Sequence, residues 1–335
     1  MRNSNNNNLN KAKGTKNDEF YTQYEDIEKE LTHYKNKFKD KVVYCNCDNP
    51  KYSNFWKYFY NNFQELHLKK LISTYFSLEG KHSYRTEFNG INLTKTKLCD
   101  NGDFRNKECV EILKEADIVI TNPPFSLLRD YIAQLMKYEK HFLIIGNKNI
   151  MSYKEIFPLL KNNKFWIGYN SVNNFQQSDG TFKKFGNIGW FTNFDIDKRH
   201  ESLLKKLYKK YSPDEYIKYD NYNAININKV TDIPIDYDEK MGVPITFLEK
   251  YNPDEFEILG ILQSSTDEEA GTPNLRYYND FKEMRQDMTY TGASGRKANG
   301  HPVVQGKSLK GNFLYNPTTN EFVHAVYARI LICRK

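Results

Sequence analysis

Four consecutive residues, Asn122, Pro123, Pro124 and Phe125, combine groups that could hold the exocyclic amino group of a base. Proline fixes the backbone and donates no N–H, so carbonyl oxygens in this stretch can face a site as rigid acceptors. The Asn122 side-chain oxygen and the Pro123 carbonyl could accept both hydrogens of one NH2. Its nitrogen lone pair would then leave ring conjugation and could attack a sulfonium methyl, with Phe125 stacked on the extruded base. The same dipeptides are also common in turns that end a strand.

A carboxylate, Asp48, follows the short apolar run 41–47 and could bind the amino group or the ribose of a cofactor. The glycine-rich loop that cradles a pyrophosphate does not follow this run. S-adenosylmethionine carries no phosphate, so it does not require such a loop. Asp48 could instead cap a helix or make an Asx turn. Further along, Asp103 could accept from the amine of a cofactor adenine and Phe104 could pack on its ring, although a polar turn and a core aromatic explain both residues equally well.

Two aromatic segments are weaker candidates. Phe20, Tyr21 and Thr22 precede the first predicted helix and could touch the methionine end of the cofactor. Thr22 could also cap that helix, with Phe20 as its hydrophobic staple. Trp190 and Phe191 lie near glycines and could form the opposite wall of a pocket for the flipped base, while a place in the core would suit them as well.

Alternating strands and helices would position these residues. Apolar runs predict strands at 41–47, 71–76, 117–121, 141–146 and 165–169. Helical spacing of apolar residues predicts helices at 23–38, 53–67, 106–115, 127–138 and 153–161. A hairpin is predicted at 80–98 and a closing strand at 327–332. The alternation predicts an α/β fold with a doubly wound sheet, in which ligands lie at the carboxyl ends of strands.

The composition is compatible with a polyanionic partner but does not identify one. The formal net charge is +7, with Lys and Arg spread along the chain. No apolar run of about 18 residues predicts a transmembrane helix, so no membrane partner is expected. The Asn-rich start lacks the apolar core of a secretion signal. The five cysteines form no C-x-x-C pair, which predicts free thiols in a reducing cytoplasm and no metal site.

Taken in order, several segments resemble the EcoRI-type adenine-specific DNA methyltransferases of restriction–modification systems. These segments are 20–22, 42–48, 102–105, 122–126, 142–148, 184–193 and 242–248. The similarity spans roughly 17–260 and the last strand, and it is weakest over 264–310. The resemblance implies a monomeric, class I (Rossmann-like) methyltransferase sheet with an added C-terminal α+β target-recognition region. It also implies S-adenosylmethionine as methyl donor and no metal.

By the same resemblance, the enzyme flips adenine from double-stranded DNA, methylates its N6 atom and protects host sites from a partner restriction endonuclease, without forming a stable complex with it. Asn122, Pro123 and Phe125 would hold the target base. Asp48, Asp103 and Phe104 would bind the cofactor, together with Phe20, Tyr21 and Thr22. The strand 71–76 lacks the acidic residue with which many methyltransferases hold the ribose, and Glu79 is the nearest substitute.

The composition, which is polar and of low complexity at the start and changes in character near residue 200, predicts the domain organisation. A disordered arm is expected over 1–16, an S-adenosylmethionine-binding catalytic domain over 17–200 and a target-recognition region over 201–335. Side chains that could read base edges in the groove lie in the last of these. The candidates are Arg276, Arg285, Arg296, Lys297 and Asn299.

Other functions fit the same residues. The Asn-Pro-Pro-aromatic pattern also serves RNA or protein-glutamine methylation. An orphan or phage enzyme would share the chemistry without a cognate endonuclease. A DNA-binding homologue without catalysis would keep the fold, with Asp48 and Asp103 as plain turn residues. GAATTC is the first candidate for the recognition sequence, and it follows from the resemblance alone.

Overall fold

A computed structural model of the chain describes residues 21–77, 82–177, 180–263 and 272–335. The chain divides into two compact units. The N-terminal unit comprises the chain up to Ile156 together with Lys164–Phe194, and the C-terminal unit comprises Phe157–Asn163 and Asp195–Lys335. The predicted boundary at residue 200 divides a catalytic domain from a target-recognition region. This division by function stays a prediction. The predicted arm 1–16 lies outside the described residues.

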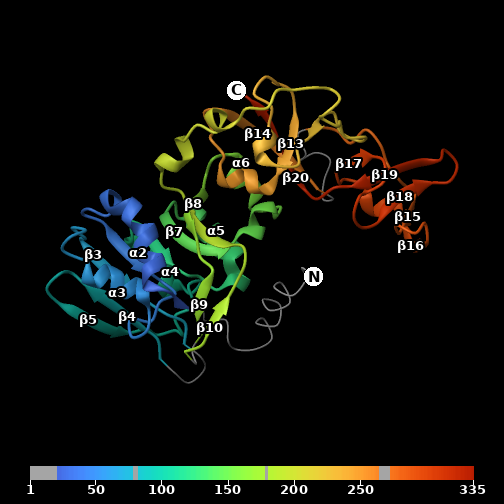
Figure 1. The fold of residues 1–335 in the computed structure, drawn as a ribbon. Coiled ribbons are helices and arrows are strands. Elements are labelled where there is room, and N and C mark those ends of the chain that lie inside the picture. Colours follow the sequence, from blue (N-terminus) through green and yellow to red (C-terminus); the bar gives the residue numbers. More distant parts are fainter. Residues whose placement is uncertain (1–20, 78–81, 178–179, 264–271) are drawn as a thin grey trace. The chain divides into compact units, whose positions relative to one another are not determined.

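The N-terminal unit is built on a mixed sheet, several strands of which are labelled in Figure 1. In the described residues the sheet has eight strands, in the order β5-β4-β3-β2-β6-β7-β11-β8. The central strands run parallel: β3 (Lys70–Ser73), β2 (Val42–Cys45), β6 (Ile118–Thr121) and β7 (His141–Asn147). The strands on either side of them pair antiparallel with their neighbours: β4 (Tyr84–Phe88) and β5 (Leu93–Lys97) beyond β3, and β11 (Ile188–Thr192) and β8 (Trp166–Ser171) beyond β7. All residues of β2 and β6 are buried, as expected for strands covered on both faces.

Helices cover both faces of this sheet. They are α2 (Tyr24–Leu31), α3 (Asn54–Asn61), α4 (Lys107–Glu115) and α5 (Leu128–Lys137), with 3-10 turns η1 (Thr32–Lys37), η2 (Phe125–Leu127) and η3 (Lys148–Ser152). On one face, Phe55 of α3 packs edge-on against Trp190 of β11, with ring centroids 5.8 Å apart. On the other face, Gly146 of β7 lets α5 come close, because a Cβ there would lie 2.4 Å from the Leu128 side chain. The α/β alternation predicted from the sequence is therefore present.

Many predicted elements are confirmed with small changes at their ends. The strands predicted at 41–47, 117–121 and 141–146 are β2, β6 and β7. The helices predicted at 106–115 and 127–138 are α4 and α5. The hairpin predicted at 80–98 consists of β4 and β5, and Gly90 in its turn has a φ of +91°, which favours glycine.

Other elements differ from the prediction. The helix predicted at 23–38 is α-helical only to Leu31 and continues as η1, and the one predicted at 53–67 ends at Asn61. The helix predicted at 153–161 begins only at Phe157, because Pro158 lacks an N–H and fits the first turn of a helix. The strand predicted at 165–169 is β8, which does not extend the parallel series, since antiparallel β11 lies between it and β7.

A separate small sheet of the N-terminal unit joins segments that are distant in sequence. It consists of β1 (Tyr21–Thr22), β9 (Asn174–Gln176) and β10 (Phe182–Lys184), in the order β1-β9-β10. Thr22 lies opposite Phe175 and Tyr21 lies opposite Gln176. The start of the described chain is therefore fixed to a segment about 150 residues further on.

The C-terminal unit contains two further sheets (Figure 1). One has the order β12 (Ile225–Asn226), β13 (Met241–Pro244), β20 (Arg329–Arg334) and β14 (Phe256–Leu262). The other has the order β16 (Tyr290–Ser294), β15 (Lys282–Met284), β18 (Phe313–Asn316), β19 (Glu321–Ala325) and β17 (Val303–Gln305). The helical elements are α6 (Phe157–Lys161), η4 (Asp197–His200), η5 (Leu204–Lys206), η6 (Val230–Asp232), η7 (Ile245–Glu249) and η8 (Gly295–Ala298). The closing strand predicted at 327–332 is β20, which lies between β13 and β14.

Candidate functional site

The two strongest sequence candidates lie at the same edge of the large sheet. Asp48 follows β2 and Asn122 follows β6, and these two strands are parallel neighbours, with Val43 opposite Ile118. Their carboxyl ends therefore meet at one edge. In an open α/β sheet this is the edge at which ligands bind.

The carboxylate of Asp48 connects three elements at this edge. One oxygen, Oδ2, accepts a hydrogen bond of 2.5 Å from the hydroxyl of Thr121, the last residue of β6. The other, Oδ1, accepts one of 2.7 Å from the hydroxyl of Ser53. Ser53 also caps α3, because its Oγ accepts from the backbone N–H groups of Phe55 and Trp56. Asp48 thus fixes the residue that directly precedes Asn122.

Burial sets the charge of this carboxyl group. Asp48 is 7% exposed, and desolvation raises its pKa to about 6, although the hydrogen bonds from Thr121 and Ser53 act in the opposite direction. A carboxyl group with this pKa can change its charge when a cation or a proton donor arrives next to it. Such shifted groups are more frequent at functional sites than elsewhere.

The tetrapeptide Asn122–Phe125 lies between β6 and η2. Pro123 is buried, whereas Asn122 and Phe125 are half-buried. The Pro124 carbonyl accepts a hydrogen bond of 3.0 Å from the N–H of Leu127, so this carbonyl belongs to the turn and the assigned acceptor is that of Pro123. The ring of Phe125 contacts Phe175 of β9 edge-on, with centroids 6.1 Å apart. The small sheet is therefore packed against the tetrapeptide.

The segment around Asp103 lies in the same region through its packing. Phe104 is 4% exposed and contacts the ring of Tyr131 in α5, with centroids 5.0 Å apart. The Tyr131 hydroxyl in turn donates to the side-chain oxygen of Asn46, two residues before Asp48. Asp103 itself pairs with Arg105, at 2.9 and 2.6 Å, and this hydrogen bonding holds the pKa of Asp103 below its usual range. Asp103 is therefore an ionised acceptor.

The residues before α2 divide between two faces of the small sheet. Neighbouring residues of a strand point to opposite sides, so Tyr21 and Thr22 cannot serve the same ligand face. Thr22 is 3% exposed, its carbonyl accepts from the Asn54 amide at 2.8 Å, and its hydroxyl makes no hydrogen bond within the described part of the chain. Gln23 occupies the N-cap position of α2, so Thr22 does not cap this helix. Phe20 lies outside the described residues.

Trp190 and Phe191 are neighbours on β11 and also point to opposite faces. Both have an exposed fraction of 0%. Trp190 packs on Phe55, and Phe191 packs on Phe165 with centroids 5.8 Å apart. In this structure both are core residues, and at most one of them could line a pocket on a given face. The wall of the base pocket assigned to them stays a prediction.

Sequence reasoning missed the side chains that connect the site. Two of them, Ser53 and Thr121, donate hydrogen bonds to the carboxylate of Asp48. The other two, Tyr131 and Asn46, are hydrogen-bonded to each other, and Asn46 lies two residues before Asp48. Only Ser53 had a visible signal, since a serine before an aromatic helix is a typical N-cap. The substitute suggested for ribose binding, Glu79, lies outside the described residues.

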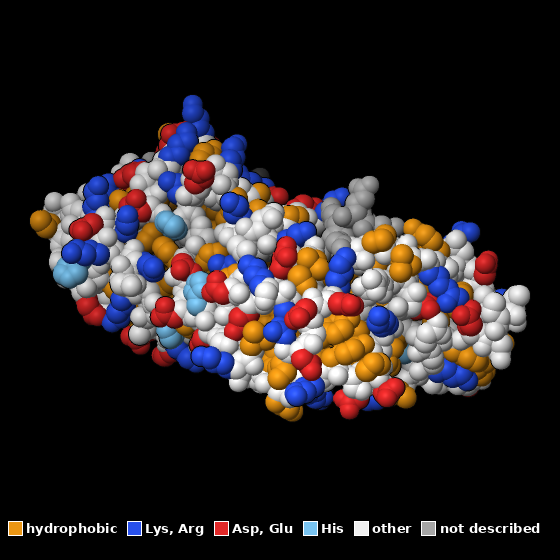
Figure 2. Space-filling view, turned by 90° about the horizontal axis from the view of Figure 1, so that it is seen from above, with side chains coloured by type: hydrophobic (Ala, Val, Ile, Leu, Met, Phe, Trp, Pro, Cys, Tyr) orange, Lys and Arg blue, Asp and Glu red, His pale blue; other side chains and the backbone are white. Residues whose placement is uncertain are grey.

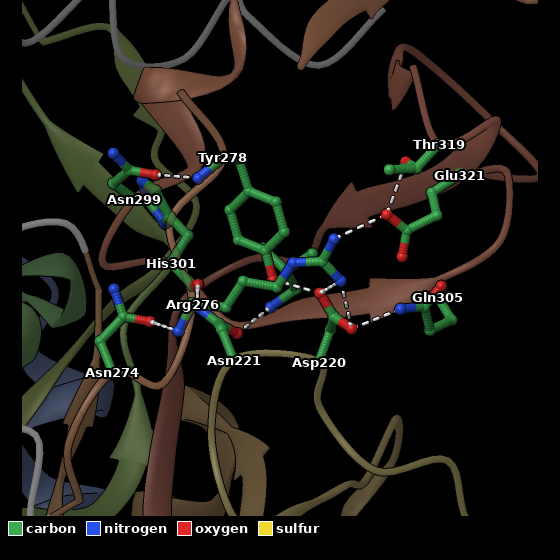
Figure 3. A network of polar contacts seen from close by, with 11 residues as sticks. Asp220, Asn221, Asn274, Arg276, Tyr278, Asn299, His301, Gln305, Thr319 and Glu321 are labelled. Atoms are coloured by element: carbon green, nitrogen blue, oxygen red, sulfur yellow. Dashed lines mark hydrogen bonds and ion pairs between the residues drawn. The ribbon is translucent and has the colours of Figure 1, made fainter. Parts of the chain in front are cut away.

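One predicted DNA-reading residue, Arg276, is engaged inside the C-terminal unit. Its guanidinium binds both carboxylate oxygens of Asp220, at 3.1 and 2.9 Å, and Glu321 at 2.8 Å (Figure 3). Asp220 also accepts from the Tyr278 hydroxyl at 2.7 Å and from Gln305. This network ties the segment at Asp220 to the five-stranded sheet. The geometry is that of a structural residue, which weakens the assignment of Arg276 to base reading.

The other candidates of this set differ in their surroundings. Lys297 is paired with Glu283, and Asn299 accepts from the N–H of Tyr278 and donates to Asn279. Within the described residues, the guanidinium of Arg285 makes long contacts inside its own turn, at 3.3 and 3.4 Å. Arg296 is exposed at the surface. Of these candidates, Arg276 and Lys297 are in ion pairs, whereas Arg285 and Arg296 make none with the described residues, so their charge is available for reading DNA.

Replacing Arg276 with alanine should lower the free energy of unfolding by about 2 kcal/mol, because Asp220, whose side chain is 10% exposed, would lose its cationic partner. Urea denaturation would measure the loss. Arg296→Ala is the matched control, and as an exposed residue it should change stability by less than about 0.5 kcal/mol. Equal stability of the two variants, with altered site preference in Arg276→Ala alone, would return Arg276 to the recognition surface.

The face of the molecule drawn in Figure 2 carries charges of both signs. On the face drawn in Figure 2, lysine and arginine side chains lie interspersed with aspartate and glutamate side chains.

Across the described residues, no group of three or more His, Cys, Asp or Glu side chains is arranged to hold a metal ion. In the same part of the chain, the helices are too short or too polar to cross a membrane.

The fold and the site define an α/β protein that gathers polar groups at the carboxyl ends of parallel strands, as ligand-binding α/β enzymes do. Comparison with known proteins gives the class. Residues 8–335 match the family described as adenine-specific methyltransferase EcoRI. No solved structure matches the chain.

Three similar proteins carry related names. The chain is 46% identical to the Type II methyltransferase M.EcoRI of Escherichia coli, over 77% of this chain and 90% of that protein. It is 40% identical to the Type II methyltransferase M.MgeORF184P of Mycoplasma genitalium, over 76% of this chain and 86% of that protein. It is 40% identical to the Type II methyltransferase M.MpnI of Mycoplasma pneumoniae, over 76% of this chain and 85% of that protein. The chain belongs to the EcoRI family of adenine-specific methyltransferases, which confirms the predicted family and enzyme class.

Proposed function

We propose that this chain is a type II DNA methyltransferase that transfers a methyl group from S-adenosylmethionine to the N6 atom of an adenine flipped out of duplex DNA. The observation that carries the proposal is the hydrogen bond from Thr121 to Asp48. It fixes Asn122 next to a buried carboxylate at the ligand edge of the sheet. The family and the names of the relatives support the reaction and the DNA substrate.

The tetrapeptide would orient the acceptor nitrogen. The side-chain oxygen of Asn122 and the carbonyl of Pro123 would accept the two N6 hydrogens, and Phe125 would stack on the adenine ring. The bound donor supplies an electrophilic methyl group on a sulfonium. The N6 nitrogen held in this way would form its new bond to that carbon as the carbon–sulfur bond breaks, and the N6 proton would then pass to water. No metal or formal base is needed for this step.

The residues present suit S-adenosylmethionine as the donor. Its methionine end carries an ammonium and a carboxylate, and the ionisable Asp48 could receive the ammonium. The buried hydroxyl of Thr22, which makes no hydrogen bond among the described residues, is a donor or acceptor ready for a ligand. Asp103 would accept from the adenine amine, with Phe104 beside the ring. Tyr21, on the opposite face of its strand, is less suited to this role.

Several finer assignments belong to the same proposal. The large sheet, with parallel neighbours β3, β2, β6 and β7, would be the class I (Rossmann-like) core. The C-terminal unit would be the α+β target-recognition region. The enzyme would act as a cytoplasmic monomer and protect host DNA from a restriction endonuclease that it does not bind stably.

Methyl transfer from labelled S-adenosylmethionine to three acceptors would test the function. We expect label in duplex DNA, recovered as N6-methyladenine, and none in tRNA or protein extracts. An oligonucleotide duplex with GAATTC is the first site to test, and sequencing of methylated DNA would find any other. Label in tRNA or in protein glutamine would replace the proposal by one of those activities. Failure to bind the cofactor in calorimetry would favour a non-catalytic homologue.

A further inference from the structure

The small sheet β1-β9-β10 presents an outer face of distinct composition. Tyr21, Gln176 and Phe182 lie opposite one another across the three strands, and Asn174 and Lys184 form the next pair on the same side. We call these five residues the outer face. They are half-buried or exposed, and Phe182 is 65% exposed. The described residues of this face include two amides, a lysine and two aromatic rings, and no carboxylate.

The opposite side of the same sheet is fixed to the catalytic tetrapeptide. Phe175, on the inner face, is fully buried and contacts Phe125 edge-on at 6.1 Å. Thr22 lies beside Phe175 in register and is also buried. Because a strand alternates its side chains, the outer face lies one sheet thickness from the residues assigned to the flipped base. The outer face therefore backs onto the residues assigned to the flipped base, with the small sheet between them.

A second aromatic pair extends this face. Tyr52, which is 51% exposed, packs next to Tyr21 with ring centroids 6.4 Å apart. The ammonium of Lys51 lies over the Tyr52 ring, 5.2 Å from its centroid. The extension adds one cation and one exposed ring and again no carboxylate. Exposed apolar groups that lie together, and not singly, often mark an interaction surface.

We infer that the outer face of the β1-β9-β10 sheet binds the duplex beside the flipped adenine, with Phe182 as an apolar wedge in the stack and Lys184 on a phosphate. The inference rests on the proposed function. Apolar side chains inserted between base steps and lysines on phosphates are common in DNA-deforming proteins. Flipping leaves a gap in the stack, and Phe182 offers an exposed aromatic ring on the small sheet whose other face contacts Phe125. Tyr21 accordingly belongs to the DNA surface and not to the cofactor site.

Replacing Phe182 with alanine tests the wedge. On an ordinary duplex, methylation by Phe182→Ala should fall about tenfold or more, because a stacking contact is lost. On a duplex with an abasic position opposite the target adenine, flipping costs less, so the loss should shrink to a few-fold. Leu93→Ala is the matched control, since Leu93 is 56% exposed on β5 of the same unit and should behave as wild type on both duplexes.

Replacing Lys184 with glutamine tests the phosphate contact. In a plot of the logarithm of duplex affinity against the logarithm of salt concentration, the slope should become shallower by about one unit. Lys97→Gln on β5 is the control, and its slope should equal that of the wild type.

The outcomes separate the inference from the function on which it rests. If the wild type fails to methylate any duplex, the proposed function is wrong. If the wild type is active but Phe182→Ala matches it, or loses equally on both duplexes, only the wedge is refuted. An unchanged salt slope in Lys184→Gln would remove the phosphate contact. Cofactor binding should be unchanged in both variants, and a loss there would show a structural defect and overturn the inference.

Discussion

Asn122→Ala should lower the turnover number on duplex DNA by about 10²- to 10³-fold, the usual cost of removing one fixed polar contact to the reacting group. Alanine lacks the oxygen that would accept an N6 hydrogen, so the nitrogen lone pair would stay conjugated with the ring. Duplex affinity should change by no more than a few-fold, because the tetrapeptide follows β6 inside the unit and carries no charge. Single-turnover methylation and a filter-binding isotherm would measure the two quantities separately.

Two further variants make the interpretation of Asn122→Ala specific. Asn122→Asp keeps an acceptor oxygen at the same position and should retain more activity than alanine. Asn193 is a matched control, since it follows antiparallel β11 at the opposite edge of the sheet and accepts from the N–H of Phe142 at 3.0 Å. Asn193→Ala should affect stability more than turnover. Full activity of Asn122→Ala would remove the tetrapeptide from the mechanism.

The strands that carry the site could be found from the sequence for a physical reason. The runs before Asp48 and before Asn122 are apolar at every position, which is typical of strands covered on both faces. Each run ends at a polar or proline-containing turn, so the end of each strand, and with it the carboxyl edge of the sheet, can be predicted. The order of apolar and polar residues alone therefore places the tetrapeptide and the acidic residue correctly at the ends of their strands.

The sequence could not show how the distant segments meet. Nothing local indicates that Tyr21 and Thr22 pair with a strand near residue 175, because pairing depends on the tertiary arrangement. The insertion of β11 between β7 and β8 is equally non-local. The sequence also could not show whether an aromatic side chain lines a pocket or lies in the core. Trp190 is of a type common in pockets, but only its packing on Phe55 shows that it lies in the core. Arg276 likewise has the charge of a DNA-binding residue, and only its two carboxylate partners show that this charge is already paired.

Asp48→Asn should lower cofactor affinity at least tenfold at pH 7.5, because a buried charge pair between Asp48 and the ammonium of the donor would be lost. In the wild type the pKa of Asp48 is raised to about 6, so the carboxylate is ionised at pH 7.5 but mostly protonated at pH 5. Cofactor affinity of the wild type should therefore rise between pH 5 and 7. The asparagine variant should lack the part of this rise that Asp48 contributes, as calorimetry at several pH values would show.

The same substitution should have an opposite effect on the stability of the protein without cofactor. The folded-state pKa of about 6 lies above the ordinary value of 3.8, so the folded protein favours the protonated form. The corresponding stabilisation is complete below pH 4 and is lost as pH rises to about 6, a change of about 3 kcal/mol. A neutral asparagine avoids this loss. Asp48→Asn should therefore be at least as stable as the wild type at pH 7.5, although it binds the donor less well.

Asp117→Asn is the control that separates a ligand-binding carboxylate from a structural one. Asp117 also bridges β2 and β6, since its Oδ2 accepts from the N–H of Val42 at 2.7 Å, but it lies at the amino end of β6. Its substitution should leave cofactor affinity unchanged and should not raise stability. If Asp48→Asn instead lost stability and kept its cofactor affinity, the role of Asp48 would be structural: it would only accept the hydrogen bonds of Thr121 and Ser53. The donor's ammonium would then have to be held by other residues at the carboxyl edge.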